Sequence, residues 1–414
     1  MERWSGAVKP VDVIYLDHAA TTPPCPAALE AVRALLEPGR IGANPSSPHR
    51  PGRRVRALLD DARDTVASRL GASPGEVVFT SGGTEADSLG LVGAARAMRR
   101  EHGRRGVVVS AIEHHAVLET AAALEREGFA VERAPCDRTG RVEAGAVEQA
   151  IGRLTARGER PAVVALMLVN NEVGTLQPVP AVAEVAHRAG ALMMSDAVQA
   201  PFVEQLEVDA LGCDLMTLSA HKMGGLPGAG VLYVRRGVPF EPLWHGGGQE
   251  RGLRPGTENV VGIVALAAAL DWARAERAAI EAHKRRLESR LLGRLSELLE
   301  QPVDLNSADA VRSPGLVSLH VAGVEAEALL VELDMAGVAC SYGAACSSGS
   351  MRPSHVLQAM GLEPERVRSS IRVSVGVTNT LEEMDEAAAR MAAAIQRLRG
   401  AGPSRVRRVG VTTP

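Results

Sequence analysis

Residues 215–225 are Leu-Met-Thr-Leu-Ser-Ala-His-Lys-Met-Gly-Gly. The first five residues, 215–219, form an apolar run that predicts a buried strand, and the following loop carries one lysine among small residues. At the carboxyl edge of a sheet, such a lysine can form a Schiff base with an aldehyde cofactor or substrate. An exposed loop lysine without a chemical role is the alternative.

Lysine is scarce in this chain. Only three of the 46 basic residues are lysines (Lys9, Lys222 and Lys284), and the other 43 are arginines. A lysine that is kept in a loop of small residues indicates chemistry that requires an amine. The scarcity therefore favours a chemical role for Lys222.

Around this stretch, short apolar runs alternate with helical stretches from about residue 75 to about residue 235. The predicted strands are 77–80, 107–110, 163–169, 192–195, 215–219 and 231–234, and the predicted helices between them include 84–102, 116–127 and 179–189. A further helix is predicted upstream, over 52–70. Apolar strands between amphipathic helices are typical of an α/β fold with a mostly parallel central sheet, covered on both faces.

The composition changes after Gly256. Residues 259–299 are rich in Ala, Leu, Glu and Arg and predict one long or kinked helix, followed by shorter strand and helix units. We therefore expect a large α/β domain over 20–257 and a smaller α+β domain over 258–414. The N-terminal residues 1–19 are expected to join the smaller domain.

Composition excludes several classes of protein. The 414 residues carry a net charge of −3 and 2% aromatic residues, which argues against a nucleic-acid-binding surface. The longest apolar run, 260–270, is shorter than the roughly 20 residues of a membrane span.

The N-terminus lacks the apolar segment of a signal peptide, so we expect a cytoplasmic protein. The five cysteines form no metal-ligand spacing, and no metal centre is expected.

Three motifs near predicted strand ends could bind a cofactor. Asp196 could pair with a protonated ring nitrogen, or it could simply cap the following turn. Residues 80–85, Thr-Ser-Gly-Gly-Thr-Glu, form a glycine turn at a helix start that could hold an anion, or a plain capped turn. His114 or His115 could stack on a flat cofactor or move protons, although a surface histidine is the more common case.

Two further residues lie in the C-terminal part. Cys346 is flanked by small residues and could act as a mobile nucleophile, whereas Cys340 is expected to be buried. Arg372 lies within an apolar strand and needs a carboxylate, which could be that of a substrate or of an internal Asp or Glu. Combined with Lys222 and Asp196, these residues point to pyridoxal phosphate and a sulfur-containing amino acid.

The chain resembles the cysteine desulfurase family of fold-type I pyridoxal-phosphate enzymes, in its nitrogenase and housekeeping iron–sulfur branch. The matching stretches are YLDHAATTP (15–23), NPSSPH (44–49), TSGGTE (80–85), EHHAVL (113–118), VNNEVG (169–174), DAVQ (196–199), SAHK (219–222), HGGGQE (245–250), RPGT (254–257), CSSGS (346–350) and SIR (370–372). The likeness therefore runs through nearly the whole chain.

The resemblance implies a role for each site residue. Lys222 would carry the cofactor and Cys346 the persulfide, with His114 stacked on the cofactor ring as a third catalytic residue. The residues implied to bind the cofactor are Gly83, Thr84, His114, Asn171, Asp196, Gln199, Ser219, His221, Lys222 and the partner subunit's Thr257. Arg372 and Asn171 would hold the substrate carboxylate.

The implied activity converts L-cysteine to L-alanine and leaves the sulfur on the enzyme as a persulfide. The enzyme is expected to be a homodimer and to pass this sulfur to a protein acceptor. Another lyase on the same fold, acting on selenocysteine or cystine, is an alternative. A catalytically silent assembly subunit is a second alternative, against which the intact Lys222, Asp196 and Cys346 argue. Neither a nucleic acid nor a membrane is an expected partner.

Overall fold

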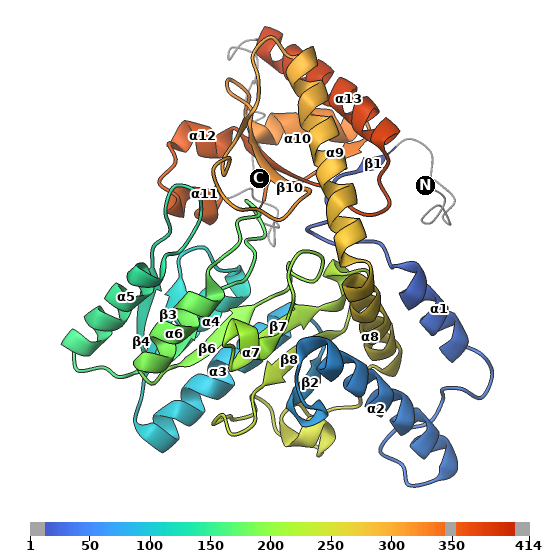
Figure 1. The fold of residues 1–414 in the computed structure, drawn as a ribbon, viewed down its shortest axis with the longest axis vertical. Coiled ribbons are helices and arrows are strands. Elements are labelled where there is room, and N and C mark those ends of the chain that lie inside the picture. Colours follow the sequence, from blue (N-terminus) through green and yellow to red (C-terminus); the bar gives the residue numbers. More distant parts are fainter. Residues whose placement is uncertain (1–12, 344–352, 402–414) are drawn as a thin grey trace, which may run out of the picture.

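A computed structural model describes residues 13–343 and 353–401 (Figure 1). Within this part of the chain, the largest sheet has seven strands in the order β2-β8-β7-β6-β5-β3-β4. The strands are β2 (Val77–Thr80), β3 (Gly106–Ser110), β4 (Ala130–Ala134), β5 (Pro161–Ala165), β6 (Leu192–Asp196), β7 (Leu215–Ser219) and β8 (Gly230–Val234). Strand β8 pairs antiparallel with both β2 and β7, whereas β3 to β7 are parallel. The expected mostly parallel sheet is confirmed.

Helices cover both faces of this sheet. Alternate strand residues point to opposite faces, so Val107 and Val109 join one apolar cluster and Val108 joins another. Helices α3 (Gly83–His102) and α4 (His115–Arg126) pack in the cluster of Val107. The opposite cluster takes residues from α1 (Pro26–Leu35), α2 (Arg50–Leu70), α5 (Ala144–Ala156), α6 (Val179–Arg188), α7 (Val208–Leu211) and α8 (Val260–Ala275). Burial on both faces explains why the strands are continuously apolar.

A second, smaller unit lies beyond the long helix α9 (Arg277–Leu298), at the top of Figure 1. Its antiparallel sheet has the order β12-β10-β9, formed by β9 (Asp304–Leu305), β10 (Leu316–His320) and β12 (Ser370–Ser374). The other elements of this unit are α10 (Ala326–Met335), β11 (Val338–Ala339), α11 (His355–Ala359), α12 (Pro364–Arg368) and α13 (Leu381–Ala401). The N-terminal strand β1 (Ile14–Tyr15) pairs with β11.

The apolar contacts separate the two units along the helices α8 and α9. Residues of α8 pack in the cluster of the large sheet, whereas Leu287, Leu291 and Leu295 of α9 pack in the cluster of the small unit. The two helices meet at Glu276. The division into 20–257 and 258–414 stays a prediction, and we propose that its boundary lies near Glu276. Ile14 and Leu16 pack with the small unit.

The predicted elements differ from the structure at a few points. The strand expected over 163–169 ends at Ala165, although backbone hydrogen bonds continue from Leu166 and Leu168 to β6. The helix expected over 259–299 is two helices that break at Glu276. Among the helices of the described residues, none is both long and apolar enough to cross a membrane.

Candidate active site

Strands β6 and β7 are hydrogen-bonded neighbours, and their carboxyl ends place the central residues of the candidate site. Asp196 ends β6, Ser219 ends β7, and Asp196 is paired in register with Thr217. Lys222 closes the short 3₁₀ helix η3 (Ala220–Lys222) that follows β7 directly. Parallel sheets bind ligands at this edge. The structure therefore brings together the strand-end lysine and aspartate that the sequence singled out.

The Lys222 amine is held by the N-terminal segment. Its Nζ donates hydrogen bonds to the backbone oxygens of Ala19 (2.7 Å) and Ala20 (2.6 Å). Burial, together with the nearby positive charge of Arg372, lowers the pKa of Lys222 to about 8. A substantial fraction of the amine is therefore neutral near physiological pH, which is the form that attacks an aldehyde.

A cup for an anion lies at the start of α3. A Cβ atom on Gly83 would lie 3.0 Å from Val198 Cγ2 and 3.4 Å from Ser219 Cβ, so Gly83 brings the helix start close to the end of β7. The Ser219 hydroxyl is buried and has no hydrogen-bond partner in the described part of the chain. Free backbone N–H groups at a helix start and an unpaired hydroxyl together suit a phosphate group.

Two other predicted phosphate-binding residues are near neighbours in sequence of Gly83 and Ser219. Thr84 is exposed in the first turn of α3. The ring of His221 lies within hydrogen-bond distance of the Thr21 hydroxyl, with 3.1 Å between Nδ1 and Oγ1. Burial and the Lys222 charge lower the pKa of His221 to about 4, so its ring is neutral at pH 7. A neutral ring N–H can still donate to a phosphate oxygen.

Asp196 and Gln199 also lie near Lys222. Asp196 is buried, and its Oδ1 accepts a hydrogen bond from the backbone N–H of Val198 (2.9 Å). Burial raises the pKa of Asp196, and the Lys222 charge opposes that rise. A protonated ring nitrogen beside Asp196 would stabilise its charged form. Gln199 Nε2 donates to the backbone oxygen of Ala19 (2.8 Å), which links it to the segment that holds Lys222.

The two adjacent histidines have different surroundings. His114 caps α4, and its Nδ1 accepts a hydrogen bond from the backbone N–H of Ala116 (3.1 Å). Burial and the Lys222 charge lower the pKa of His114 to about 4, so the ring is neutral. His115 is exposed and its ring packs against His355, with 4.5 Å between the ring centroids. The charge state of His114 therefore depends on its burial and on Lys222.

Arg372 is paired with a carboxylate of the chain itself. Its Nη2 donates to Asp17 Oδ1 (2.7 Å), and its Nη1 donates to the backbone oxygens of Asn171 (2.9 Å) and Gly343 (3.0 Å). Of the two partners left open by the sequence, the internal carboxylate is present in this structure. The Arg372 Nε has no hydrogen-bond partner among the described residues, so the guanidinium retains a free donor.

The two candidate cysteines are not equally placed. Cys346 lies outside the described residues, 13–343 and 353–401. Cys340 follows β11 and is only partly buried, so the expected burial is incomplete. Desolvation by the surrounding protein and the nearby Asp17 charge still raise the pKa of its thiol to about 12. A thiol with this pKa is almost entirely protonated at pH 7 and is a poor nucleophile.

Thr257 is exposed. The neighbouring Arg254 forms an ion pair with Glu85 in the first turn of α3, with 2.7 Å between Nε and Oε1. Glu250, in the same loop, is buried and accepts hydrogen bonds from Arg63 and from the backbone N–H of Phe79. This loop is therefore anchored beside the cup while Thr257 faces outward.

Sequence reasoning missed Asp17 and the Glu250–Arg63 pair as contributors. Asp17 lies in the stretch 15–23 that resembles the family, but nothing in that stretch indicates that the Asp17 carboxylate pairs with Arg372. The one sequence signal for this ion pair was Arg372 itself, because a charged residue within an apolar strand needs a carboxylate partner. No group of three or more His, Cys, Asp or Glu side chains within 13–343 and 353–401 is arranged to bind a metal ion.

Several known proteins are similar to this chain over most of its length. The aminotransferase class-V family model matches residues 14–386. An IscS-like cysteine desulfurase of Mycobacterium tuberculosis is 42% identical over 391 residues, which are 94% of this chain and 97% of that protein. A cysteine desulfurase of Cereibacter sphaeroides is 40% identical over 395 residues, covering 94% and 97% of the two chains.

This chain belongs to the cysteine desulfurase family of class-V aminotransferases. Solved structures agree: a NifS-like protein superposes with a TM-score of 0.84 at 33% identity, covering 93% of this chain and 100% of that one. The structure of SspA in complex with cysteine has a TM-score of 0.74 at 32% identity, covering 88% and 99%. Membership of the family and its fold, both expected from the sequence, are confirmed.

Proposed function

We propose that this member of the family is an L-cysteine desulfurase that uses pyridoxal phosphate. The observation that carries the proposal is the Lys222 amine, with its lowered pKa, at a sheet edge shared with Asp196 and the anion cup of Gly83 and Ser219. A covalent amine site, a carboxylate for a ring nitrogen and a phosphate cup are the three groups that this cofactor needs.

The residues of the site fit the cofactor. The unpaired Ser219 hydroxyl and the start of α3 would hold the phosphate, with Thr84 and His221 beside them. Asp196 would hold the ring nitrogen and His114 would lie on the ring face, while Gln199 and Asn171 would contact its substituents. When bound, pyridoxal phosphate supplies an electron sink for the charge that develops at the substrate Cα.

Lys222 would move the proton at the substrate Cα. Because its pKa is near 8, the neutral amine can accept a proton and the ammonium can return it at the same pH. Arg372 and Asn171 would bind the substrate carboxylate, and the free Nε of Arg372 offers a donor for it. Because its pKa is lowered, His114 would stay neutral and act as a hydrogen-bond donor or acceptor.

Cys346 would receive the sulfur. As its thiolate bonds to the substrate sulfur, the carbon–sulfur bond of cysteine breaks, and alanine and an enzyme persulfide result. The persulfide then passes to a protein acceptor. The raised pKa of Cys340 supports the choice of Cys346, because a protonated thiol is a weak nucleophile.

We propose that the enzyme is a homodimer in which Thr257 completes the phosphate site of the partner. The outward position of Thr257 and the anchoring of its loop by Arg254 and Glu250 support this arrangement. Thr257→Ala is expected to weaken cofactor binding about tenfold, through one lost hydrogen bond to a charged group. Equilibrium dialysis against the cofactor measures this, and an unchanged affinity would place Thr257 outside the site.

The activity is tested by quantifying products from L-cysteine under reducing conditions. Alanine and sulfide are expected in equal amounts from the wild type. Cys346→Ser is expected to bind cysteine but release no sulfide, whereas the matched control Cys340→Ser keeps most activity. Full sulfide release by Cys346→Ser, or turnover of selenocysteine alone, would indicate one of the other lyases of this fold.

A further inference from the structure

Two buried carboxyl groups near Asp196 have no role in the site described above. Asp87 lies on α3 and is 1% exposed, and Glu113 follows β3 and is 0% exposed. Each of them has Asp196 as an electrostatic neighbour, and Asp87 also has Glu113. Three carboxyl groups therefore lie close together where the ring of the cofactor is proposed to bind.

The hydrogen bond of Asp87 connects it to the strand beside Asp196. The Thr217 hydroxyl donates to Asp87 Oδ1 at 2.6 Å, and Thr217 is paired in register with Asp196 on the neighbouring parallel strand. Two residues earlier on these strands, Leu215 and Met194 pack in the apolar cluster of α3. Because side chains alternate along a strand, Thr217 and Asp196 face α3 as well. Asp87 therefore approaches Asp196 from α3, through Thr217.

Glu113 is held at its strand ends by neutral donors. Its Oε1 accepts hydrogen bonds from the Ser110 hydroxyl (2.5 Å) and from the backbone N–H of Met167 (2.9 Å). Its other oxygen, Oε2, is buried and has no hydrogen-bond partner among the described residues. Burying an unpaired oxygen costs more on a charged carboxylate than on a neutral acid. The surroundings of Glu113 therefore favour its protonated form.

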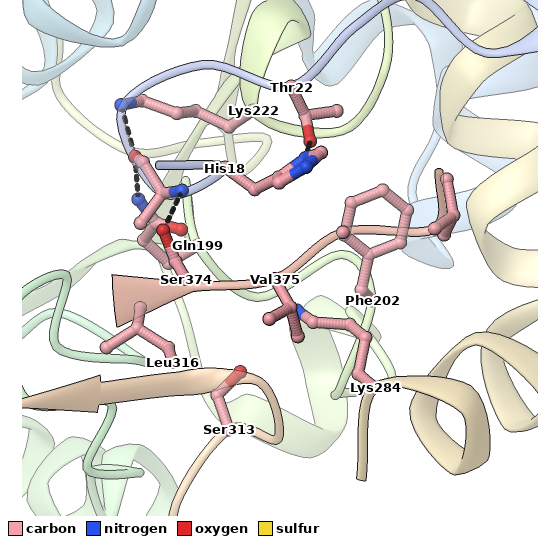
Figure 2. A pocket seen from close by; sticks show the side chains of 13 residues that line it. His18, Thr22, Gln199, Phe202, Lys222, Lys284, Ser313, Leu316, Ser374 and Val375 are labelled. Carbon is pink, nitrogen blue, oxygen red and sulfur yellow. Dashed lines mark hydrogen bonds between the residues drawn. The ribbon is translucent and has the colours of Figure 1, made fainter. Parts of the chain in front are cut away.

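The positive charge that acts on Asp196 is that of Lys222. One backbone oxygen of the N-terminal segment accepts hydrogen bonds from the Lys222 amine and from Gln199 (Figure 2). In the described part of the chain, the donors to Asp87 and Glu113 are all uncharged. Since one ammonium balances one carboxylate, burial and the charge of Asp196 raise the pKa of Asp87 well above its usual value and that of Glu113 to about 8.

We propose that Asp87 and Glu113 keep their protons in the folded protein, so that Asp196 alone of the three ionises, and that Asp87 is a positioning residue for Asp196. A charged Asp87 would favour protonation of Asp196, which would then lose its pairing with a ring nitrogen. Neutral Asp87 avoids this and still accepts the hydrogen bond of Thr217. The inference rests on the proposed function, because the ring nitrogen is the partner for which Asp196 stays charged.

Infrared spectroscopy of the apoprotein at pH 7 tests the protonation states without cofactor or turnover. A protonated carboxylic acid has a carbonyl band that is separate from the bands of carboxylates. Asp87→Asn and Glu113→Gln are each expected to lose one such acid band. The control Asp385→Asn, which removes an exposed carboxylate paired with Arg290, is expected to lose none. An acid band that is unchanged in Asp87→Asn would overturn the proposal, and this result is separate from any failure of the proposed function.

Turnover of L-cysteine by the holoenzyme tests the positioning role. Asp87→Ala leaves the Thr217 hydroxyl without its acceptor beside Asp196, so kcat is expected to fall about tenfold, the equivalent of about one hydrogen bond. Asp87→Asn resembles the protonated acid, keeps an acceptor for Thr217 and should restore most of this loss. The control Ser88→Ala removes the next side chain of α3, whose hydroxyl lies 3.0 Å from that of Thr120, and should leave kcat unchanged. Equal losses in Asp87→Ala and Asp87→Asn would contradict a neutral Asp87.

Discussion

The ion pair between Asp17 and Arg372 predicts an unusual effect of a single substitution. The Asp17 carboxylate accepts a hydrogen bond from Arg372 Nη2 at 2.7 Å, and the Arg372 side chain is only 4% exposed. If Arg372 binds the substrate carboxylate, Asp17 competes with the substrate for the same guanidinium. Asp17→Asn keeps the shape of the side chain and removes the competing charge.

The magnitude follows from the bond that is lost. A hydrogen bond between charged groups contributes about 1.5–3 kcal/mol, and each 1.4 kcal/mol corresponds to about tenfold in affinity. We therefore expect the KM for L-cysteine to fall about tenfold in Asp17→Asn. The same change leaves Arg372 without its counterion, so the free energy of unfolding should fall by about 1–3 kcal/mol.

Steady-state kinetics with L-cysteine and urea unfolding measure the two effects on the same preparation. The control is Asp385→Asn, which removes an exposed carboxylate that pairs with Arg290 on the surface. The control is expected to change neither the KM nor the free energy of unfolding measurably, because exposed ion pairs contribute little to stability. An unchanged or higher KM in Asp17→Asn would show that Asp17 does not compete with the substrate at Arg372.

Three further predictions concern the cofactor site and its support. The rate of cofactor uptake by the apoprotein, followed by absorbance, should rise with pH and level off above about 8, because deprotonation of Lys222 creates the reactive amine; a plateau near 10.5 would contradict the lowered pKa. Asp196→Asn should retain the cofactor but lose at least about a hundredfold in kcat; near-normal turnover would exclude Asp196 from the site. Arg63→Met should lose about 3–5 kcal/mol in urea unfolding, because Glu250 is left buried and unpaired, whereas the exposed Arg56→Met should lose less than about 1 kcal/mol; equal losses would contradict this.

The sheet and its helices could be predicted because burial imposes a strong pattern on the sequence. Strands β2 and β7 have the predicted bounds, since each is an apolar run with clear limits. Strand β4 was missed because it lies at the sheet edge, where four of its five residues, including Glu132 and Arg133, are at least partly exposed. The break at Glu276 has no glycine or proline to mark it.

The part of the site that could be predicted is the part that the order of the strands brings together. Lys222, Asp196 and Ser219 follow neighbouring strands, so the topology alone brings them to one edge. The pairing of Asp17 with Arg372 spans 355 residues along the chain and depends on the N-terminal segment pairing in parallel with the end of β12, where Asp17 lies opposite Ser374. No local pattern encodes such a contact, and the same holds for the burial of Glu250 against Arg63.

The transfer of sulfur from cysteine to this enzyme is the central claim, and one measurement tests it directly. The holoenzyme is mixed with one equivalent of cysteine labelled with radioactive sulfur, quenched with an alkylating agent and digested for peptide mapping. Label on the peptide of Cys346, with an equal amount of alanine, is the expected result. Label on the peptide of Cys340, or free labelled sulfide with pyruvate in place of alanine, would contradict it.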